Sequence, residues 1–186
     1  MSDQPMNDQP TGEGANLDFS FPEGMHPGLK GLAWLIGHWE GFGQTQWPGS
    51  DNARVLEQVD FHHNGEPYLH YLLQAYEDED GQLGKPVYME TGFWVPQEKN
   101  ELMVVICNPE GVAQKWFGSI TGLESAPGGE LGTKIDLTTD AALSEGTHTA
   151  GTRLYGRIQQ KLLFACDRAD QDIPLAPWLT GELERK

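Results

Sequence analysis

After Gly37 the sequence consists of short β-rich segments that turn residues interrupt at regular intervals, and this pattern constrains the fold more than any other feature. Asn64-Gly65 is one such interruption, between Phe61 and Tyr68, and an Asn-Gly pair flanked by β-forming residues predicts a hairpin. Regular short strands with only one helical segment indicate an all-β barrel or sandwich. We expect strands at residues 38–46, 53–63, 67–77, 85–95, 100–107, 111–120, 131–138, 147–157, 160–167 and 178–185.

The strand segments favour a barrel, because polar and aromatic residues mix on both of their alternating faces, as in residues 68–76. The interior of a barrel that holds a ligand need not be uniformly aliphatic. Closure also removes the sheet edges that otherwise invite aggregation. A length of 186 residues suits a single domain of this kind.

One short helix is expected before the first strand. Leu29, Leu32, Ala33 and Ile36 recur at the spacing of a single helix face. The preceding proline and the following glycine suit the two ends of such a helix. At about ten residues it is too short to be stable alone, so it must pack on the barrel.

Acidic residues outnumber basic ones in this chain. Residues 1–24 carry five acids and no Lys or Arg, and we expect them to form a disordered tail before a barrel domain at residues 25–186. The net charge of −16 disfavours nucleic-acid and membrane-surface partners, which are themselves anionic. The chain shows no membrane-spanning apolar run and no signal-peptide pattern, so we expect a cytoplasmic protein in which Cys107 and Cys166 are buried free thiols.

A glycine-rich motif follows the expected helix: Gly37, Trp39, Gly41 and Gly43 form G-x-W-x-G-x-G. This motif resembles the signature of the nitrobindin family, whose members are haem-binding ten-stranded barrels. Further segments that are similar to the family pattern lie at residues 57–71, 85–94, 109–118, 153–155 and 174–185. The resemblance covers residues 27–186 and implies a ten-stranded antiparallel barrel, similar to lipocalins and fatty-acid-binding proteins, with one short N-terminal helix.

Three positions depart from the family pattern. The resemblance implies that the haem-ligating histidine lies in the closing segment, immediately before the position of Leu179. This chain has Trp178 there. An indole nitrogen is a donor only and cannot ligate iron. Tyr88 stands where the family often has a histidine, and Arg168 where it often has a methionine. These changes indicate a remodelled pocket, and we expect no cofactor, with haem b as the alternative.

A substitute haem ligand would have to come from elsewhere in the barrel. His70, with Tyr68 and Leu72 on the same face of its strand, is the best of these, although a structural histidine is the more usual finding in a barrel. We expect His148 to lie in an exposed loop. The full set of candidate ligands is His38, His62, His63, His70, His148, Met89, Tyr88, Tyr155, Cys107 and Cys166.

Arg168 can be interpreted in two ways. If it points inward, it is a cation that could pair with the acidic head group of a ligand. If it lies outward or at the rim, next to Asp167 and Asp170, it forms an ordinary ion pair. We favour the outward or rim position.

Three functions are compatible with these residues. The first, which we favour, is a nitrobindin-like barrel that has lost haem-iron ligation and is a non-catalytic binding module for an apolar small molecule. The second is a haem-binding nitrobindin that acts on nitric oxide and peroxynitrite, as a peroxynitrite isomerase, through a substitute ligand.

The third is side-chain catalysis such as hydrolysis, although the sequence contains no G-x-S-x-G, HExxH or P-loop motif. Glu57 and Glu90, expected on adjacent strands, could approach each other. A barrel glutamate more often pairs with a buried arginine, and Arg153 is available for that role.

Overall fold

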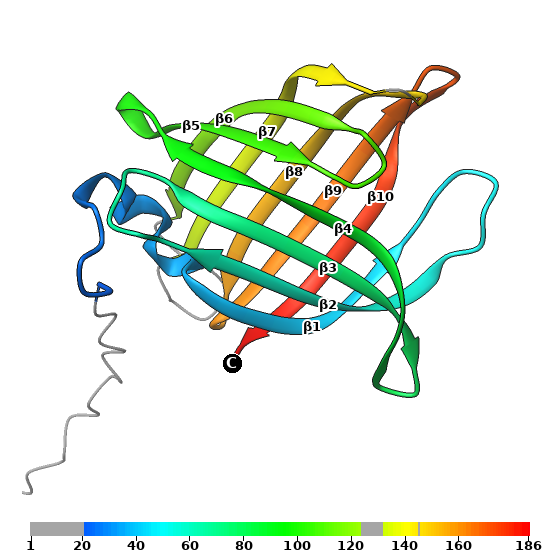
Figure 1. Cartoon of the computed structure of the whole chain (residues 1–186), viewed down its shortest axis with the longest axis horizontal. Helices are drawn as coiled ribbons and strands as arrows, with labels where there is room; N and C mark the ends of the chain where they lie inside the picture. The colour runs from blue at the N-terminus through cyan, green and yellow to red at the C-terminus, as the bar shows by residue number, and fades with distance from the viewer. Residues whose placement is uncertain (1–20, 124–131, 145) are drawn as a thin grey trace, which may run out of the picture.

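The computed structural model describes residues 21–123, 132–144 and 146–186, and across these residues ten strands close into one antiparallel barrel (Figure 1). The strand order around the barrel is β1-β10-β9-β8-β7-β6-β5-β4-β3-β2, so the first and last strands pair and complete the closure. The strands are β1 (Gly37–Thr45), β2 (Ala53–His62), β3 (Leu69–Glu79), β4 (Gln82–Pro96), β5 (Glu101–Cys107), β6 (Ala113–Leu123), β7 (Gly132–Leu143), β8 (His148–Ile158), β9 (Lys161–Asp170) and β10 (Ile173–Arg185).

The predicted fold class is therefore confirmed, and the differences concern where strands begin and end. The predicted last strand began at residue 178, whereas β10 begins at Ile173 and includes Pro174 and Pro177. Proline lacks an N–H for the ladder and is tolerated at bulges. The pairing of β10 with β9 is indeed irregular in this stretch, with register shifts between Ile173 and Ala176 and between Pro177 and Leu179.

The short helix expected before β1 is present as a 3₁₀ helix, η1 (Pro27–Leu35), which lies against one end of the barrel (Figure 1). The expected face was only partly correct, because Trp34 and Leu35 are also buried while Ile36 is half-buried. The indole Nε1 of Trp39 in β1 donates a hydrogen bond to the carbonyl oxygen of Leu35 at 2.7 Å. The guanidinium of Arg185 in β10 donates a hydrogen bond to the carbonyl oxygen of Trp34 and lies 4.5 Å from the Trp39 ring centroid, so both neighbouring strands hold the helix end.

The hairpin turns follow the predicted signals. The Asn64-Gly65 hairpin between β2 and β3 is confirmed, and the side-chain oxygen of Asn64 accepts a hydrogen bond from the Glu66 amide. Asp80 and Gly81, both with positive φ, form the two-residue turn between β3 and β4. A second short 3₁₀ turn, η2 (Glu98–Asn100), joins β4 to β5. None of the helices in the described residues is long and apolar enough to cross a membrane.

The barrel interior is filled mainly by aromatic side chains. The largest of the fully buried side chains are those of Trp39, Trp94, Trp116, Tyr71, Tyr155 and Phe61. Trp94 contacts both Phe61 and Tyr155 edge to face, with ring centroids 5.3 and 5.0 Å apart. Such rings bury large areas and give this barrel a packed core in place of a large internal void.

The prediction for the two cysteines was half correct. Both thiols are free, but only Cys166 is buried, whereas Cys107 at the end of β5 is exposed. Cys166 lies on the inward face of β9, while Cys107 lies on the outward face of β5. The strand parity of each residue decides its exposure.

Candidate functional site

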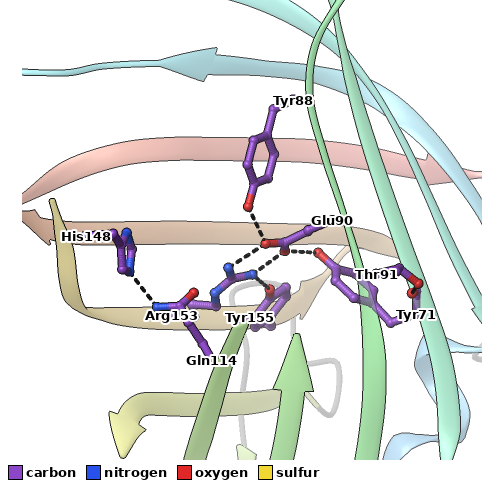
Figure 2. A network of polar contacts seen from close by, with 8 residues as sticks. All are labelled: Tyr71, Tyr88, Glu90, Thr91, Gln114, His148, Arg153 and Tyr155. Atoms are coloured by element: carbon purple, nitrogen blue, oxygen red, sulfur yellow. Dashed lines mark hydrogen bonds and ion pairs between the residues drawn. The ribbon is translucent and has the colours of Figure 1, made fainter. Parts of the chain in front are cut away.

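A buried ion pair crosses the barrel interior between Glu90 on β4 and Arg153 on β8 (Figure 2). The guanidinium binds both carboxylate oxygens, Nη1 to Oε1 and Nη2 to Oε2, the second at 2.7 Å. The side chains are only 1% and 3% exposed, so this is a fully desolvated bidentate pair. The interpretation that a barrel glutamate satisfies Arg153 is confirmed for Glu90.

Three tyrosines complete this polar network (Figure 2). The hydroxyls of Tyr71 and Tyr88 each donate to one oxygen of Glu90 at 2.7 Å, and Arg153 donates to the Tyr155 hydroxyl at 3.2 Å. Burial of Glu90 alone would raise its pKa, but the charge of Arg153 and these hydrogen bonds outweigh burial and lower the pKa. Glu90 is therefore held as a carboxylate whose lone pairs are occupied.

Trp178 lies at a β-bulge beside this network. It falls in the register shift between Pro177 and Leu179, where β10 carries one residue more than β9. A bulge redirects a side chain relative to strict alternation. The Trp178 indole meets the Tyr88 ring edge to face, with centroids 4.6 Å apart. The structure thus brings two of the altered family positions into direct contact.

A small cavity of about 20 Å³ remains next to this aromatic pair. A volume of this size holds about one water molecule, whereas pockets for drug-sized ligands measure about 300–1,000 Å³. The lining also includes Arg168, so the three altered positions surround one cavity. The residues that enclose it are Tyr88, Asn108, Val112, Gln114, Trp116, His148, Arg153, Cys166, Asp167, Arg168 and Trp178.

Arg168 occupies the rim of this cavity, in agreement with the favoured interpretation. Its guanidinium donates to both carboxylate oxygens of Asp170 at 2.8 and 3.0 Å and lies 5.1 Å from the ring centroid of Trp47. Burial opposes ionisation of Asp170, but the hydrogen bonds from Arg168 and Thr147 prevail and lower its pKa. Arg168 is thus already paired within the chain and is not an inward-pointing cation for a ligand head group.

His148 is the imidazole that lines the cavity, and the expectation that it lies in an exposed loop was wrong. It begins strand β8 and is half-buried, with its Nε2 2.5 Å from the side-chain nitrogen of Gln114 (Figure 2). Burial and the nearby charge of Arg168 lower the pKa of His148, so it is neutral at pH 7.

His70, the best of the candidate substitute ligands, points away from the interior and has the structural role that is more usual for a barrel histidine. It is exposed on the outer face of β3, where its Nε2 bonds the Thr91 hydroxyl at 3.0 Å and its ring contacts Phe93. The inward residues of β3 are its neighbours Leu69 and Tyr71. A shift of one residue in strand parity moves a side chain to the opposite face.

The other candidate ligands do not gather in the interior either. His38 lies on the outer face of β1, bonded to Asp60 at 2.8 Å and to Glu40 at 3.0 Å. Met89 is 38% exposed. Among the described candidates, Tyr88, Tyr155 and Cys166 lie inside the barrel together with the half-buried His148, and burial raises the pKa of the Cys166 thiol to about 12.

The environment of Glu57 differs from the one expected from the sequence. Glu57 was expected beside Glu90 on an adjacent strand, but β3 separates β2 from β4, and the two carboxyls belong to different environments. Glu57 is 1% exposed, and neither of its carboxyl oxygens has a hydrogen-bond partner in the described part of the chain. Burial raises its pKa to about 8, so the group is largely a neutral acid at pH 7.

The glycine motif makes room for this carboxyl group. A Cβ on Gly43 would lie 2.5 Å from Glu57 Cδ, and a Cβ on Gly181, the residue paired with Gly43, would lie 2.3 Å from Glu57 Oε2. The paired strands β1 and β10 therefore each place a glycine, which has no side chain, against the carboxyl group of Glu57. The G-x-W-x-G-x-G motif is the sequence signal for this site. Its partner on β10, Gly181, can be identified only from the pairing of β10 with β1.

A larger hollow of about 1170 Å³ lies outside the barrel wall, over the outer faces of β1, β2, β9 and β10. Exposed Phe42 and Leu83 contribute to it, together with surface ions such as Lys161 and Glu182. The buried Glu57 and Phe164 also line it, whereas Glu90, Arg153 and the three tyrosines of the polar network do not. Size alone does not make it the binding site.

The residues around the inner cavity do not fit a haem in this arrangement. The cavity is far smaller than a porphyrin, and the Tyr88 hydroxyl is committed to Glu90. Trp178 offers no lone pair to iron. We therefore derive no chemical step through a haem.

Known proteins share this architecture. Residues 28–185 match the family model described as the THAP4-like, haem-binding β-barrel domain. The chain belongs to this family. The chain is similar to a ferric nitrobindin-like protein of Cutibacterium acnes, which is 39% identical over 175 residues, a match that covers 91% of this chain and 99% of that protein.

A protein of Nocardioides sp. named peroxynitrite isomerase is 32% identical over 174 residues, covering 91% of this chain and all of its own length. The crystal structure of Rv2717c from M. tuberculosis superposes with a TM-score of 0.78 at 25% identity, covering 87% of this chain and 99% of that one. The resemblance to nitrobindins is therefore confirmed at the level of the THAP4-like family.

Proposed function

We propose that this chain is a non-catalytic member of its family, in which the barrel's own side chains occupy the interior site and no haem is bound. The contact between Trp178 and Tyr88, with ring centroids 4.6 Å apart, carries this proposal. The two rings meet where the resemblance aligns the iron ligand, and the space that remains beside them is about 20 Å³.

The chemistry of the surrounding groups supports the same conclusion. Haem iron is held in proteins by His, Cys thiolate, Met or Tyr. The Cys166 thiol stays protonated because burial raises its pKa to about 12, and the Tyr88 hydroxyl is bonded to Glu90. A relative is named peroxynitrite isomerase, and we infer that this chain has lost that activity.

The second candidate is a haem protein of the same family that uses a substitute ligand. One observation favours His148 over His70 for this role, because His148 lines the inner cavity and is neutral at pH 7. Binding would then require the His148–Gln114 contact to break and Trp178 to leave its position against Tyr88.

A haemin titration followed by absorbance distinguishes the two candidates. We expect the wild-type chain to give no stoichiometric Soret band, and the double variant Trp178→His, Arg168→Met to gain one. Phe93→His, which adds an imidazole on the exposed outer face, is the matched control and should gain none. A stoichiometric band in the wild-type chain that His148→Ala abolishes would establish the second candidate.

The proposal includes a cytoplasmic location. An apolar small molecule stays the proposed ligand class, and it could enter the interior only if Trp178 left Tyr88, because the cavity beside them measures about 20 Å³. Both cysteines are free, and thiols such as Cys107 and Cys166 stay reduced in the cytoplasm. Mass spectrometry of small molecules that co-purify with the folded protein tests the ligand class, and cell fractionation tests the location.

A further inference from the structure

The pairing of β1 with β10 closes the barrel and differs from the other strand pairings of the described residues (Figure 1). Every other pairing joins strands that follow each other in the chain, whereas this one joins the first strand to the last, and no turn links them. We call residues 41–45 of β1 and their partners, residues 179–183 of β10, the closing seam. Gly43 pairs with Gly181 at its centre, so no pair of side chains packs across the seam there.

An unpaired acid lies against this glycine pair on the inner side of the wall. Glu57 on β2 is 1% exposed, and neither of its carboxyl oxygens has a hydrogen-bond partner in the described part of the chain. A Cβ at Gly43 or at Gly181 would come within 2.6 Å of the Glu57 carboxyl group. The carboxyl group therefore rests against the backbone of the closing seam.

Among the described residues, no charged side chain offsets the burial of Glu57. Its partners on the neighbouring strands are Gly41 of β1 and Ala75 of β3. From β9 come Phe164, whose ring also borders the glycine pair, and Cys166, whose thiol burial keeps protonated. Burial accordingly raises the pKa of Glu57 to about 8, and no opposing charge lowers it.

Solvent lies on the other side of the closing seam. The hollow of about 1170 Å³ on the outer wall is lined by Gly41, Gly43 and Gly181 of the seam and also by Glu57. The backbone of the seam is therefore what separates the carboxyl group from water. If β1 and β10 separate locally, Glu57 becomes hydrated while the hairpin pairings of the barrel stay intact.

We propose that the closing seam is a pH-sensitive element, which opens locally and hydrates Glu57 when that carboxyl group ionises. A carboxylate that is buried without a partner is costly, and local opening of the seam is its shortest route to water. Contacts at both ends limit the opening to the seam. At one end Arg185 donates a hydrogen bond to the carbonyl oxygen of Trp34. At the other, the Gln46 amide donates to the carbonyl oxygen of Trp178 at 2.9 Å.

The direction of the pH dependence follows from proton linkage. In the open seam the hydrated carboxyl group titrates near its ordinary value of 4.5, whereas in the closed seam burial raises its pKa to about 8. Between these values the closed seam holds a proton that the open seam releases, so the open population grows by up to about tenfold per pH unit. Above about pH 8 the carboxyl group is ionised in both forms, and the dependence levels off.

Amide hydrogen exchange of the full chain, measured by mass spectrometry from pH 6 to pH 8 and corrected for the intrinsic exchange rate, tests the seam. We expect the protection factors of its amides to fall at least about tenfold over this range. At pH 8 they should lie below those of β5 and β6, on the opposite side of the ring. Glu57→Gln should remove the fall. Glu184→Gln, at an exposed carboxylate of β10, is the matched control and should keep it.

Circular dichroism confirms that each variant is folded, and Glu57→Met, an apolar side chain of similar length, provides the same test if Glu57→Gln does not fold. Seam protection that is independent of pH in the wild-type chain would overturn the proposal. So would an equal fall in the folded Glu57 variants. Equal protection of the seam and of β5 and β6 at every pH would also overturn it, because global unfolding gives that result.

Discussion

Replacing Glu57 with glutamine should change how the stability of the barrel depends on pH. Glu57 is enclosed between β1 and β10, where Gly43 and Gly181 leave it just enough room and no hydrogen-bond partner is found among the described residues. In the unfolded chain the carboxyl group titrates at about 4.5, whereas in the barrel burial raises its pKa to about 8. The folded state therefore binds a proton that the unfolded state releases.

The sign and size of the effect follow from proton linkage. Below about pH 4.5 both states are protonated, and Glu57 does not oppose folding through its charge. Between pH 4.5 and 8 the folded state holds more protons, so the free energy of unfolding falls as the pH rises. A difference of about 3.5 pH units at about 1.4 kcal/mol each gives an upper bound of about 5 kcal/mol.

Urea unfolding between pH 5 and 9 measures this effect. In Glu57→Gln the uncharged amide removes the Glu57 contribution to the pH slope, at a pH-independent cost of about 1–3 kcal/mol for its unpaired donors. We expect the variant to be the less stable protein at pH 5 and the more stable one at pH 9. Glu184→Gln, at an exposed carboxylate, controls for general charge effects. Parallel stability curves for Glu57→Gln and the wild-type chain would refute the reasoning.

Three further variants or titrations test other contacts. Arg153→Met should lower the free energy of unfolding at pH 7 by about 3–5 kcal/mol, because it leaves the Glu90 carboxylate buried without a counter-charge; a loss below about 1 kcal/mol would contradict the buried pair. Gly181→Ala should cost about 1–3 kcal/mol in thermal unfolding, because its Cβ would lie 2.3 Å from Phe164 Cε1; an unchanged midpoint would show that the site has free space. In an NMR titration the His38 imidazole should show a pKa above its ordinary value of 6.5, because it bonds two carboxylates; a value at or below 6.5 would show that these bonds do not persist in solution.

The fold could be predicted from the sequence because its signals are local. Turn residues such as Asn64-Gly65 and Asp80-Gly81 mark hairpins within a few residues of chain, and hairpins in series define the neighbours of each strand. The start of β10 could not be predicted in this way. Pro174 and Pro177 suggest a break, and only the pairing with β9 reveals that they lie at irregularities inside a strand.

The site was less predictable, since it depends on strand parity and on contacts between distant segments. Periodicity groups His70 with Tyr68 and Leu72 on one face of the strand, but it cannot settle which face turns inward where polar and aromatic residues lie on both sides. The contact of Trp178 with Tyr88 depends on a bulge in β10. The enclosure of Glu57 depends on which strand closes the barrel beside β1.

The haem content of the wild-type protein, isolated from cells supplied with excess haem precursor and measured as the pyridine haemochrome, tests the central claim most directly. With Trp178 packed on Tyr88 and a cavity of about 20 Å³, we predict folded protein that contains essentially no haem. An equimolar haem content in folded wild-type protein would contradict the account.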